Sequence, residues 1–288
     1  MIALRPIAEL DVSAASGLVQ RGSVVYVVAD DETFLDVYAI ATGLRTARVS
    51  LFDDVLPADP EARKVRKPDL EALTSLPDGR LLALGSGSTD RRARGVVLSS
   101  TDGEGAPPRD PQLVDLAPLY ETLRRRFPQL NIEGAAACGG LLRLLQRGGA
   151  GRDNAVIDLD LGATMRRIDD RAPLDAELVC AVRSVPLGLL DGVALGFTDA
   201  APIDDSSADI AFVAAAEDTD DPYRDGPCKG SVIGLLDAEA RVTRVDRIAG
   251  SVKIEGLAVR RGVGLWLVAD PDDRAVRAPL FEADWPWG

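Results

Sequence analysis

Short apolar runs alternate with polar turns along the whole chain, and the same order of elements recurs five times. Each copy opens with a polar residue followed by two small or apolar ones, after which come a turn and a strongly apolar strand. In the second copy, Glu71-Ala72-Leu73 leads through a Pro-Asp-Gly turn to Leu81–Leu84. Short apolar runs bounded by turn residues are typical of buried strands. The pattern therefore predicts an all-β chain built from repeated units.

The five copies open at regular intervals. Their first residues are 55, 62, 65 and 57 residues apart, and a period of this length with four strands per copy is typical of propeller blades. We therefore predict an all-β, five-bladed β-propeller with four-stranded antiparallel blades, in a single domain of residues 1–288. A β-sandwich and a six-bladed ring are the alternatives. The five openers are Ser16, Glu71, Glu133, Thr198 and Glu255.

The limits of the blades follow from the openers and from the strands between them. Ile2–Leu10 precedes the first opener, and we expect it to supply the outer strand of the last blade, which would hide a sheet edge. The fourth strand of the third copy has the weakest pattern, near Met165–Ile168. Tyr120–Phe127 predicts a short amphipathic helix with a solvated basic face. The predicted blades cover about 11–55, 68–117, 130–170, 193–250 and 251–288, the last completed by 2–10.

The openers predict a metal site. The first strand of each propeller blade lines the central channel, so equivalent positions meet around one axis. Three facing carboxylates, Glu71, Glu133 and Glu255, repel one another unless a cation or protons neutralise them. Their oxygens, together with the hydroxyls of Ser16 and Thr198, are ligands that suit Ca²⁺, with Mg²⁺ and Mn²⁺ as alternatives. The other interpretation is that these five are only turn residues at the starts of strands.

The loops after the second strands should return to the same mouth of the channel. Asp30 and Glu217 lie in these loops, and either carboxylate could orient a water molecule. Arg92 and Arg147 could offset negative charge on a substrate. These four are the candidate catalytic residues, and the expected ligand is a small phosphorylated or carboxylated anion. Gly85–Thr89 could cradle a phosphate, although a turn is the alternative because no Gly-Lys-Ser/Thr follows it.

Composition removes several classes of function. The net charge of −13 and the lack of a long basic stretch argue against a nucleic-acid partner. The chain has no histidine, which excludes Ser-His-Asp catalysis and most zinc sites. Its three cysteines are widely spaced, which suits a reducing compartment. With no leader pattern and no long apolar run, we expect a cytoplasmic protein that does not enter a membrane.

The order of the openers resembles that of the calcium-activated nucleotidase (apyrase) family, in which Ser, Glu, Glu, Ser and Glu from successive blades bind Ca²⁺. Thr198 is a conservative departure, and Lys253-Ile254-Glu255-Gly256 resembles that family's last-blade Lys-Tyr-Glu-Gly. The chain departs further by lacking a secretory signal and most of the aromatic residues that stack on a base. Its Glu-Gly-Leu openers are also similar to those of esterase-like phytase and gluconolactonase-like bacterial propellers. The resemblance implies a five-bladed fold with Ca²⁺ in the tunnel.

Two functions are compatible with these residues. The first is a Ca²⁺-dependent hydrolase of a phosphoanhydride or phosphoester, or of a related ester or lactone, acting at the tunnel mouth. The second is a non-catalytic propeller that binds a ligand or a protein, with Ca²⁺ as a structural ion that relieves repulsion in the tunnel.

Overall fold

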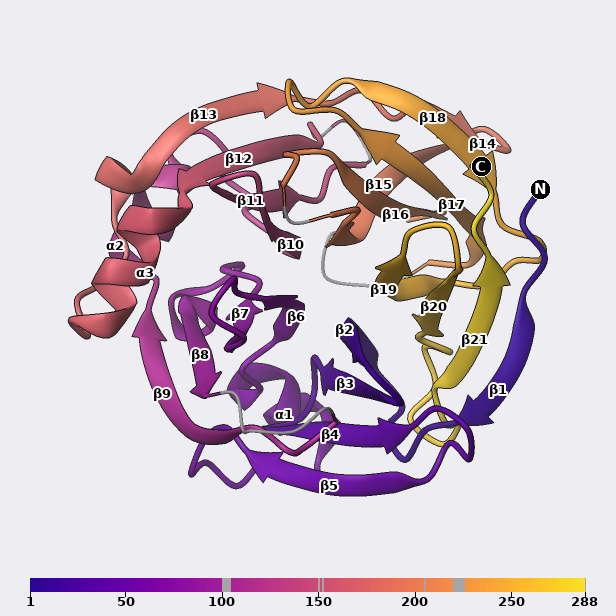
Figure 1. Cartoon of the computed structure of the whole chain (residues 1–288), viewed down its shortest axis with the longest axis horizontal. Coiled ribbons are helices and arrows are strands. Elements are labelled where there is room, and N and C mark those ends of the chain that lie inside the picture. Colours follow the sequence, from indigo (N-terminus) through magenta and orange to yellow (C-terminus); the bar gives the residue numbers. More distant parts are fainter. Residues whose placement is uncertain (100–104, 150, 152, 205, 220–225, 288) are drawn as a thin grey trace.

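Five antiparallel sheets are arranged around a central axis in the computed structural model (Figure 1). The structure describes residues 1–99, 105–149, 151, 153–204, 206–219 and 226–287. Every strand pair within the sheets is antiparallel, and the strand nearest the axis comes first along the chain in blades 1 to 3 and 5. Blade 4 carries one additional short strand beside its inner strand. The predicted five-bladed propeller is therefore confirmed.

The strands have the following bounds. Blade 1 contains β2 (Ala15–Arg21), β3 (Val24–Ala29), β4 (Phe34–Ala39) and β5 (Arg45–Ser50). Blade 2 contains β6 (Leu70–Ser75), β7 (Leu81–Gly85), β8 (Arg94–Ser99) and β9 (Arg109–Asp115). Blade 3 contains β10 (Ile132–Cys138), β11 (Leu141–Gln146), β12 (Ala155–Asp160) and β13 (Val179–Ser184). Blade 4 contains β14 (Leu189–Leu190), β15 (Val193–Pro202), β16 (Ile210–Glu217), β17 (Cys228–Leu236) and β18 (Val242–Arg247). Blade 5 contains β19 (Ile254–Arg260), β20 (Gly264–Ala269), β21 (Pro279–Asp284) and β1 (Arg5–Glu9).

The third blade differs from the prediction. The segment near Met165–Ile168, predicted as its fourth strand, lies in helix α3 (Leu161–Asp169). Asp160 caps this helix by accepting a hydrogen bond from the backbone N–H of Ala163 at 2.6 Å. The buried positions of the segment recur at helical spacing, not at the alternating spacing of a strand. The fourth strand is β13, so the blade extends to Ser184 and does not end near residue 170.

Two further helices lie between blades. Helix α1 (Pro60–Arg66) leads into blade 2, and Asp59 caps it by accepting from the N–H of Ala62 at 2.9 Å. Helix α2 (Ala117–Arg124) follows blade 2 and begins three residues before the predicted Tyr120–Phe127. Two 3₁₀ turns, at Asp90–Arg92 and Ala176–Leu178, complete the helical elements of the described residues.

The ring closes between the two ends of the chain. Strand β1 pairs with β21, and the pairing joins Arg5 to Glu282 and Glu9 to Pro279. The N-terminal segment therefore supplies the outermost strand of blade 5, as predicted. This arrangement covers an edge of β21 that would otherwise be open.

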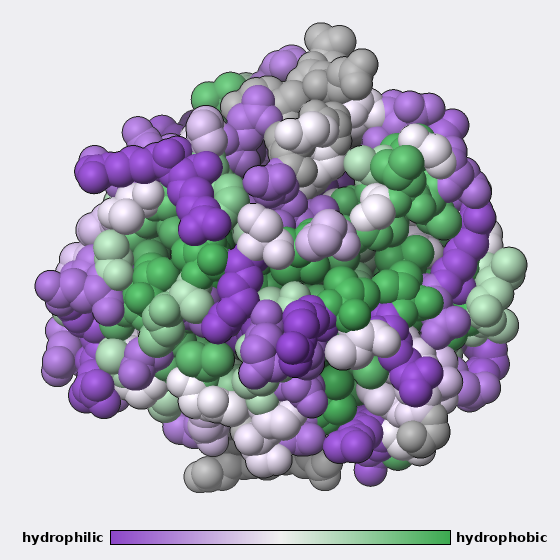
Figure 2. Space-filling view, turned by 90° about the horizontal axis from the view of Figure 1, so that it is seen from above, coloured by the Kyte–Doolittle hydropathy of each residue, from purple (hydrophilic) through white to green (hydrophobic). Residues whose placement is uncertain are grey.

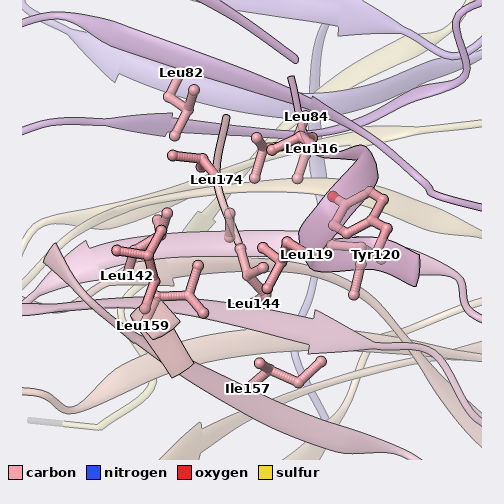
Figure 3. Close-up of a cluster of buried hydrophobic side chains, with 14 of the residues drawn as sticks. Leu82, Leu84, Leu116, Leu119, Tyr120, Leu142, Leu144, Ile157, Leu159 and Leu174 are labelled. Atoms are coloured by element: carbon pink, nitrogen blue, oxygen red, sulfur yellow. The ribbon is translucent and has the colours of Figure 1, made fainter. Parts of the chain in front are cut away.

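Apolar side chains of neighbouring blades pack against one another. Between blades 2 and 3, Leu82 and Leu84 of β7 pack in one cluster with Leu142 and Leu144 of β11, and Tyr120 of α2 joins them (Figure 3). The two-residue spacing within each strand follows from the alternation of side chains across a sheet. Each of these side chains is at most 1% exposed. The angle between the blades is thus set by a close-packed interface.

Figure 2 shows one side of the molecule, where apolar areas lie between strips of hydrophilic side chains. The large exposed apolar residues, such as Leu113 in blade 2 and Leu189 in blade 4, come from different blades. Isolated exposed apolar side chains are ordinary on a protein surface. None of the helices in the described part of the chain combines the length and the apolar character needed to span a bilayer.

Candidate functional site

All five predicted openers lie at a bulge of the innermost strand, as its second residue in blades 1, 2, 3 and 5 and inside β15 in blade 4. In β6 the pairing register shifts between Leu70 and Ala72, which leaves Glu71 as the additional residue. In β19 it shifts around Glu255 in the same way. The inner strands of the other three blades show a register shift at their openers as well. Because a bulge redirects the side chain of its additional residue, the shared bulge gives the five openers equivalent positions in their blades, and their union in one metal site stays a prediction.

The inner strands approach one another too closely for most side chains at the next position. A Cβ atom on Gly256 would lie 2.3 Å from the carbonyl oxygen of Ser16, and one on Gly134 would lie 2.8 Å from the backbone nitrogen of Ala200. Small residues therefore follow the openers in four blades. The close approach also narrows the channel directly beside the openers.

The two hydroxyl openers bind the backbone of the following blade. Ser16 Oγ donates a hydrogen bond to the carbonyl oxygen of Leu70 at 2.5 Å. Thr198 Oγ1 donates to the carbonyl oxygen of Ile254 at 2.6 Å. Each acceptor residue directly precedes a glutamate opener, so these bonds connect adjacent openers across a blade interface. The contribution of the two hydroxyls to a metal site stays a prediction.

Arg147 lies among the glutamates of blades 3, 4 and 5. Its Nη1 atom lies 3.2 Å from Glu133 Oε2 and 3.7 Å from Glu255 Oε1, and its Nη2 atom lies 2.5 Å from Glu217 Oε2. These four side chains are between 6% and 13% exposed. Two predicted catalytic residues, Arg147 and Glu217, are thus in direct contact. Arg147 supplies from within the chain some of the positive charge that the facing glutamates require.

Lys253 adds a second internal cation on the blade 5 side. Its Nζ atom lies 2.9 Å from Glu217 Oε1, 3.2 Å from Glu255 Oε1 and 2.9 Å from Asp272 Oδ1. Asp270 is farther from this amine, with Oδ2 at 3.8 Å. Burial, outweighing the attraction of Lys253, raises the pKa of Asp270 to about 7. Asp270 can therefore exchange a proton near neutral pH.

A third cluster occupies the side formed by blades 1 and 2. One carboxylate oxygen from each of Asp30, Asp69 and Glu71 lies within 4.8 Å of the others, a spacing that could hold a metal ion. Lys67 Nζ contacts Asp30 and lies 2.8 Å from Asp69 Oδ1. Although burial lowers the pKa of Lys67, Asp30 and Asp69 outweigh that effect and keep the amine charged. Glu71 has no hydrogen bond or ion pair to a described residue.

Asp69 is held in place by the loop that follows β7. Ser86 Oγ donates to Asp69 Oδ2 at 2.5 Å, and Arg92 Nη1 donates to the same oxygen at 2.8 Å. Ser88 Oγ accepts from Arg92 at 2.8 Å. The segment Gly85–Thr89 therefore supports a carboxylate with its side chains, and Arg92 is already engaged in the same task. The second terminal nitrogen of Arg92, Nη2, donates to the backbone oxygen of Lys64 at 3.0 Å, and a role of Arg92 toward a substrate stays a prediction.

Carboxylates outnumber cationic side chains at the mouth. Burial raises the pKa of Glu71 well above its ordinary value, and nearby Glu133 and Asp69 raise it further. Burial likewise raises the pKa of Glu255 well above its ordinary value, despite the opposing effect of Lys253. The excess negative charge favours the binding of a proton or of a cation. The eight acids are Asp30, Asp69, Glu71, Glu133, Glu217, Glu255, Asp270 and Asp272, and the four cations are Lys67, Arg92, Arg147 and Lys253.

The sequence did not identify Asp199 as part of the channel. This carboxylate is fully buried, and the backbone N–H of Leu257 in blade 5 donates to its Oδ2 at 2.7 Å. Burial raises the pKa of Asp199 well above its ordinary value. Asp199 follows the opener Thr198, where the other four copies have glycine or alanine. The acidic residue at a position where the other copies have a small one was the indication in the sequence that Asp199 has a special role.

The repeat pattern also did not identify Lys67 and Asp69 as residues of the tunnel mouth. Both precede Glu71 in the segment that links α1 to β6, and the repeat pattern alone gave them no equivalents in the other copies. Lys253 entered the prediction only as part of a motif. Its position two residues before Glu255 was the available indication that it could reach the same acids.

The sequence matches one family model, described as "Family of unknown function (DUF6929)", over residues 11–284. No curated protein matches the sequence.

Several solved structures have a similar fold. Glutaminyl cyclase from Myxococcus xanthus is 14% identical with a TM-score of 0.55, and the match covers 98% of this chain and 96% of that one. A putative glycoside hydrolase from Parabacteroides distasonis is 14% identical with a TM-score of 0.52, covering 97% and 89%. The PQQ-bound aldose sugar dehydrogenase from Streptomyces coelicolor is 13% identical with a TM-score of 0.52, covering 99% and 98%. These neighbours include a hydrolase and a dehydrogenase, so the shared fold does not by itself select a reaction.

Proposed function

The chain belongs to the DUF6929 family, and from the chemistry of its tunnel mouth we propose that it is a Ca²⁺-dependent hydrolase of a small anionic phosphoester. The site of the reaction in this proposal is the cluster formed by blades 1 and 2 together with the blade 5 loop. The apyrase-like resemblance of the openers supports the choice of ion and of reaction type. The nucleotide specificity of that family is not part of the proposal.

The observation that carries the proposal is the excess of buried negative charge. Asp30, Asp69 and Glu71 place three carboxylate oxygens within 4.8 Å of one another. Such oxygens are the ligands that hard divalent cations prefer. An anionic substrate would be repelled by this mouth as it stands, and a divalent cation would reverse the local charge. The acid content of the site supports the proposal that a cation binds before the substrate does.

The fit of the cluster to a cation depends on Lys67. Its ammonium group already contacts Asp30 and Asp69, so a cation that uses both carboxylates must displace it. Glu71 offers its oxygens without such competition from a described residue. A bound Ca²⁺ would supply polarisation of the substrate's phosphoryl oxygens and offset their charge.

In this proposal, side chains near β19 and in the loop after β20 of blade 5 carry out the proton transfer and order the wall of the site. Asp270 has a pKa of about 7 and is available to accept a proton from the attacking water, while the leaving alcohol takes its proton from solvent. Lys253 fixes the neighbouring Asp272 and Glu217, which orders the wall of the site. Arg147 holds three glutamates and in this proposal keeps them apart from the substrate.

Replacing Glu71 with glutamine tests the proposal. We expect Ca²⁺-dependent phosphate release to fall at least about 100-fold, because the amide keeps the shape and removes the charge that binds the cation. Without Ca²⁺ the variant should melt at a higher temperature than the wild type at pH 8. The raised pKa of Glu71 means that its ionisation opposes folding as the pH rises, and glutamine does not ionise. Phosphate release and thermal melting measure the two effects.

The matched control is Glu121→Gln on the exposed face of α2, which should change neither quantity. If the wild type releases no phosphate with Ca²⁺ from any phosphoester tested, the hydrolase proposal fails. If release persists unchanged in Glu71→Gln, the cation lies elsewhere.

Lys67→Met should raise the affinity for Ca²⁺. Removing the ammonium group leaves Asp30 and Asp69 without their internal cation, so the ion no longer has to displace one. Titration calorimetry with CaCl₂ should show affinity at least about tenfold tighter than that of the wild type. In the absence of Ca²⁺ the variant should be less stable, since the acids are then uncompensated. Arg66→Met, at the exposed end of α1, is the control, and equal affinities in all three proteins would contradict the displacement model.

One observation favours the second candidate, a non-catalytic propeller with a structural ion. Arg147 joins glutamates from blades 3, 4 and 5, and Lys253 joins blade 4 to blade 5. Such bonds hold the ring together at its axis. In that case Ca²⁺ would raise the melting temperature, while a panel of phosphoesters would stay intact.

A further inference from the structure

A pocket of about 250 Å³ lies beside the blade 1 and blade 2 cluster. Its walls come from the end of β3 in blade 1, from helix α1 and from the loop after β20 in blade 5. Asp30 and Lys67 belong both to this pocket and to the carboxylate cluster described above. A group bound in the pocket would therefore lie next to the proposed reaction site.

The lining of the pocket is charged and carries an excess of acid. Ten of its thirteen described lining residues are ionisable, six of them acidic and four basic. Its apolar lining residues are Ala14 and Pro60, and none of the described lining residues is aromatic. An apolar or aromatic group placed here would remove charged side chains from water without replacing their contacts. A ligand group with a positive charge would instead balance the excess of carboxylates.

Asp31 gives a second indication, namely that the ligand carries a hydrogen-bond donor. The side chain lines the pocket and is 9% exposed. Its Oδ2 atom lies 3.5 Å from Arg63 Nε and 3.1 Å from Arg274 Nη2. Its Oδ1 atom is buried and has no hydrogen-bond partner among the described residues. The carboxylate therefore keeps an acceptor oxygen that its two arginine contacts do not use, and a ligand N–H group would satisfy it after a small rotation of the side chain.

The walls are fixed before any ligand arrives. Arg63 of α1 donates from Nε to the backbone oxygen of Asp31 at 2.9 Å, and its Nη2 atom lies 2.6 Å from Glu32. Arg274 connects the blade 5 loop to the same aspartate. These bonds hold helix, blade 1 and blade 5 around one hollow. A preorganised pocket loses little conformational entropy on binding.

Resting on the proposed hydrolase function, we infer that this pocket binds a primary ammonium group of the substrate, which makes the substrate a phosphoester of a small amino alcohol. A primary ammonium group offers three N–H donors and one positive charge, which matches several carboxylates at once. A quaternary ammonium group has no N–H donor and is usually bound by aromatic rings, which this lining lacks. A nucleoside would likewise find no ring on which to stack.

Three matched substrates test the inference. O-phosphoethanolamine carries the primary ammonium group, phosphocholine carries the charge without N–H donors, and 2-hydroxyethyl phosphate has a hydroxyl in its place. With Ca²⁺ present, we expect kcat/KM for O-phosphoethanolamine to exceed the other two by about tenfold or more, the value of one charge-assisted contact. Asp31→Asn and the exposed rim variant Asp273→Asn should bring this ratio close to one, whereas Asp11→Asn, outside the pocket, should preserve it.

Binding of ethanolamine alone, followed by saturation-transfer NMR, separates the two proposals. If no substrate releases phosphate but ethanolamine binds the wild type and not Asp31→Asn, the hydrolase proposal fails and the ammonium pocket stands. If phosphate release is Ca²⁺-dependent but equal for all three substrates, and ethanolamine does not bind, the pocket inference is overturned and the hydrolase stands. Should Asp31→Asn fold poorly, the same comparison with Asp273→Asn decides, because that residue lies at the exposed rim.

Discussion

Replacing Arg147 with methionine should destabilise the protein by about 3–5 kcal/mol, the usual cost of leaving buried charges without their partner. Glu133, Glu217 and Glu255 are each less than 10% exposed, and all three contact the guanidinium group. The loss should be larger at pH 8 than at pH 5. Burial raises the pKa values of Glu133 and Glu255, so both carboxyl groups are increasingly protonated as the pH falls and then repel each other less. Denaturant unfolding at the two pH values measures the difference.

The effect of Ca²⁺ on the melting temperature gives a second test of the Arg147→Met variant. If the glutamate openers can bind a cation, removing Arg147 frees Glu133 and Glu255 for it, and Ca²⁺ should raise the melting temperature of the variant more than that of the wild type. Arg277→Met is the control, because Arg277 is 61% exposed and pairs with Asp11 at the surface. An equal shift in wild type and variant would show that the ring of openers is not a cation site and that Arg147 and Lys253 balance its charge without an added ion.

The positions of the openers were predictable from sequence because a propeller repeats one structural unit. Glu71 and Glu255 lie far apart along the chain, yet both follow an apolar residue and precede a small one. The structure gives both the same bulge, and a repeat with a fixed geometry brings equal positions to one axis. The bulge itself left no separate mark in the sequence beyond the small residue after the opener.

The partners of the openers were not predictable in the same way. Lys67 reaches Asp30 and Asp69 from the end of helix α1, which leads into blade 2, and Arg147 crosses to two other blades. Such contacts depend on the lengths and paths of individual loops, which do not repeat. The sequence therefore indicated the acids of the mouth and their mutual repulsion, but not that the chain supplies cations of its own.

The wrong position predicted for the fourth strand of blade 3 has a related cause. The segment near Met165–Ile168 was assigned by counting strands per repeat, and the insertion of helix α3 between β12 and β13 breaks that count. Its helical spacing and the capping aspartate at Asp160 were visible in the sequence. Local helix chemistry outweighed the repeat pattern there, as it does wherever an insertion lies between two strands of a blade.

Replacing Asp270 with asparagine should lower kcat for Ca²⁺-dependent phosphate release by about 100-fold or more while KM changes little, because the amide keeps the shape of the side chain but cannot accept the proton from water. The wild-type rate should rise with pH and level off, with a midpoint near pH 7 that a neighbouring bound cation moves lower. Asparagine at this position should abolish that pH dependence. Asp11→Asn, outside the pocket, should keep the full pH profile. An unchanged profile in Asp270→Asn would assign the titrating group to another residue.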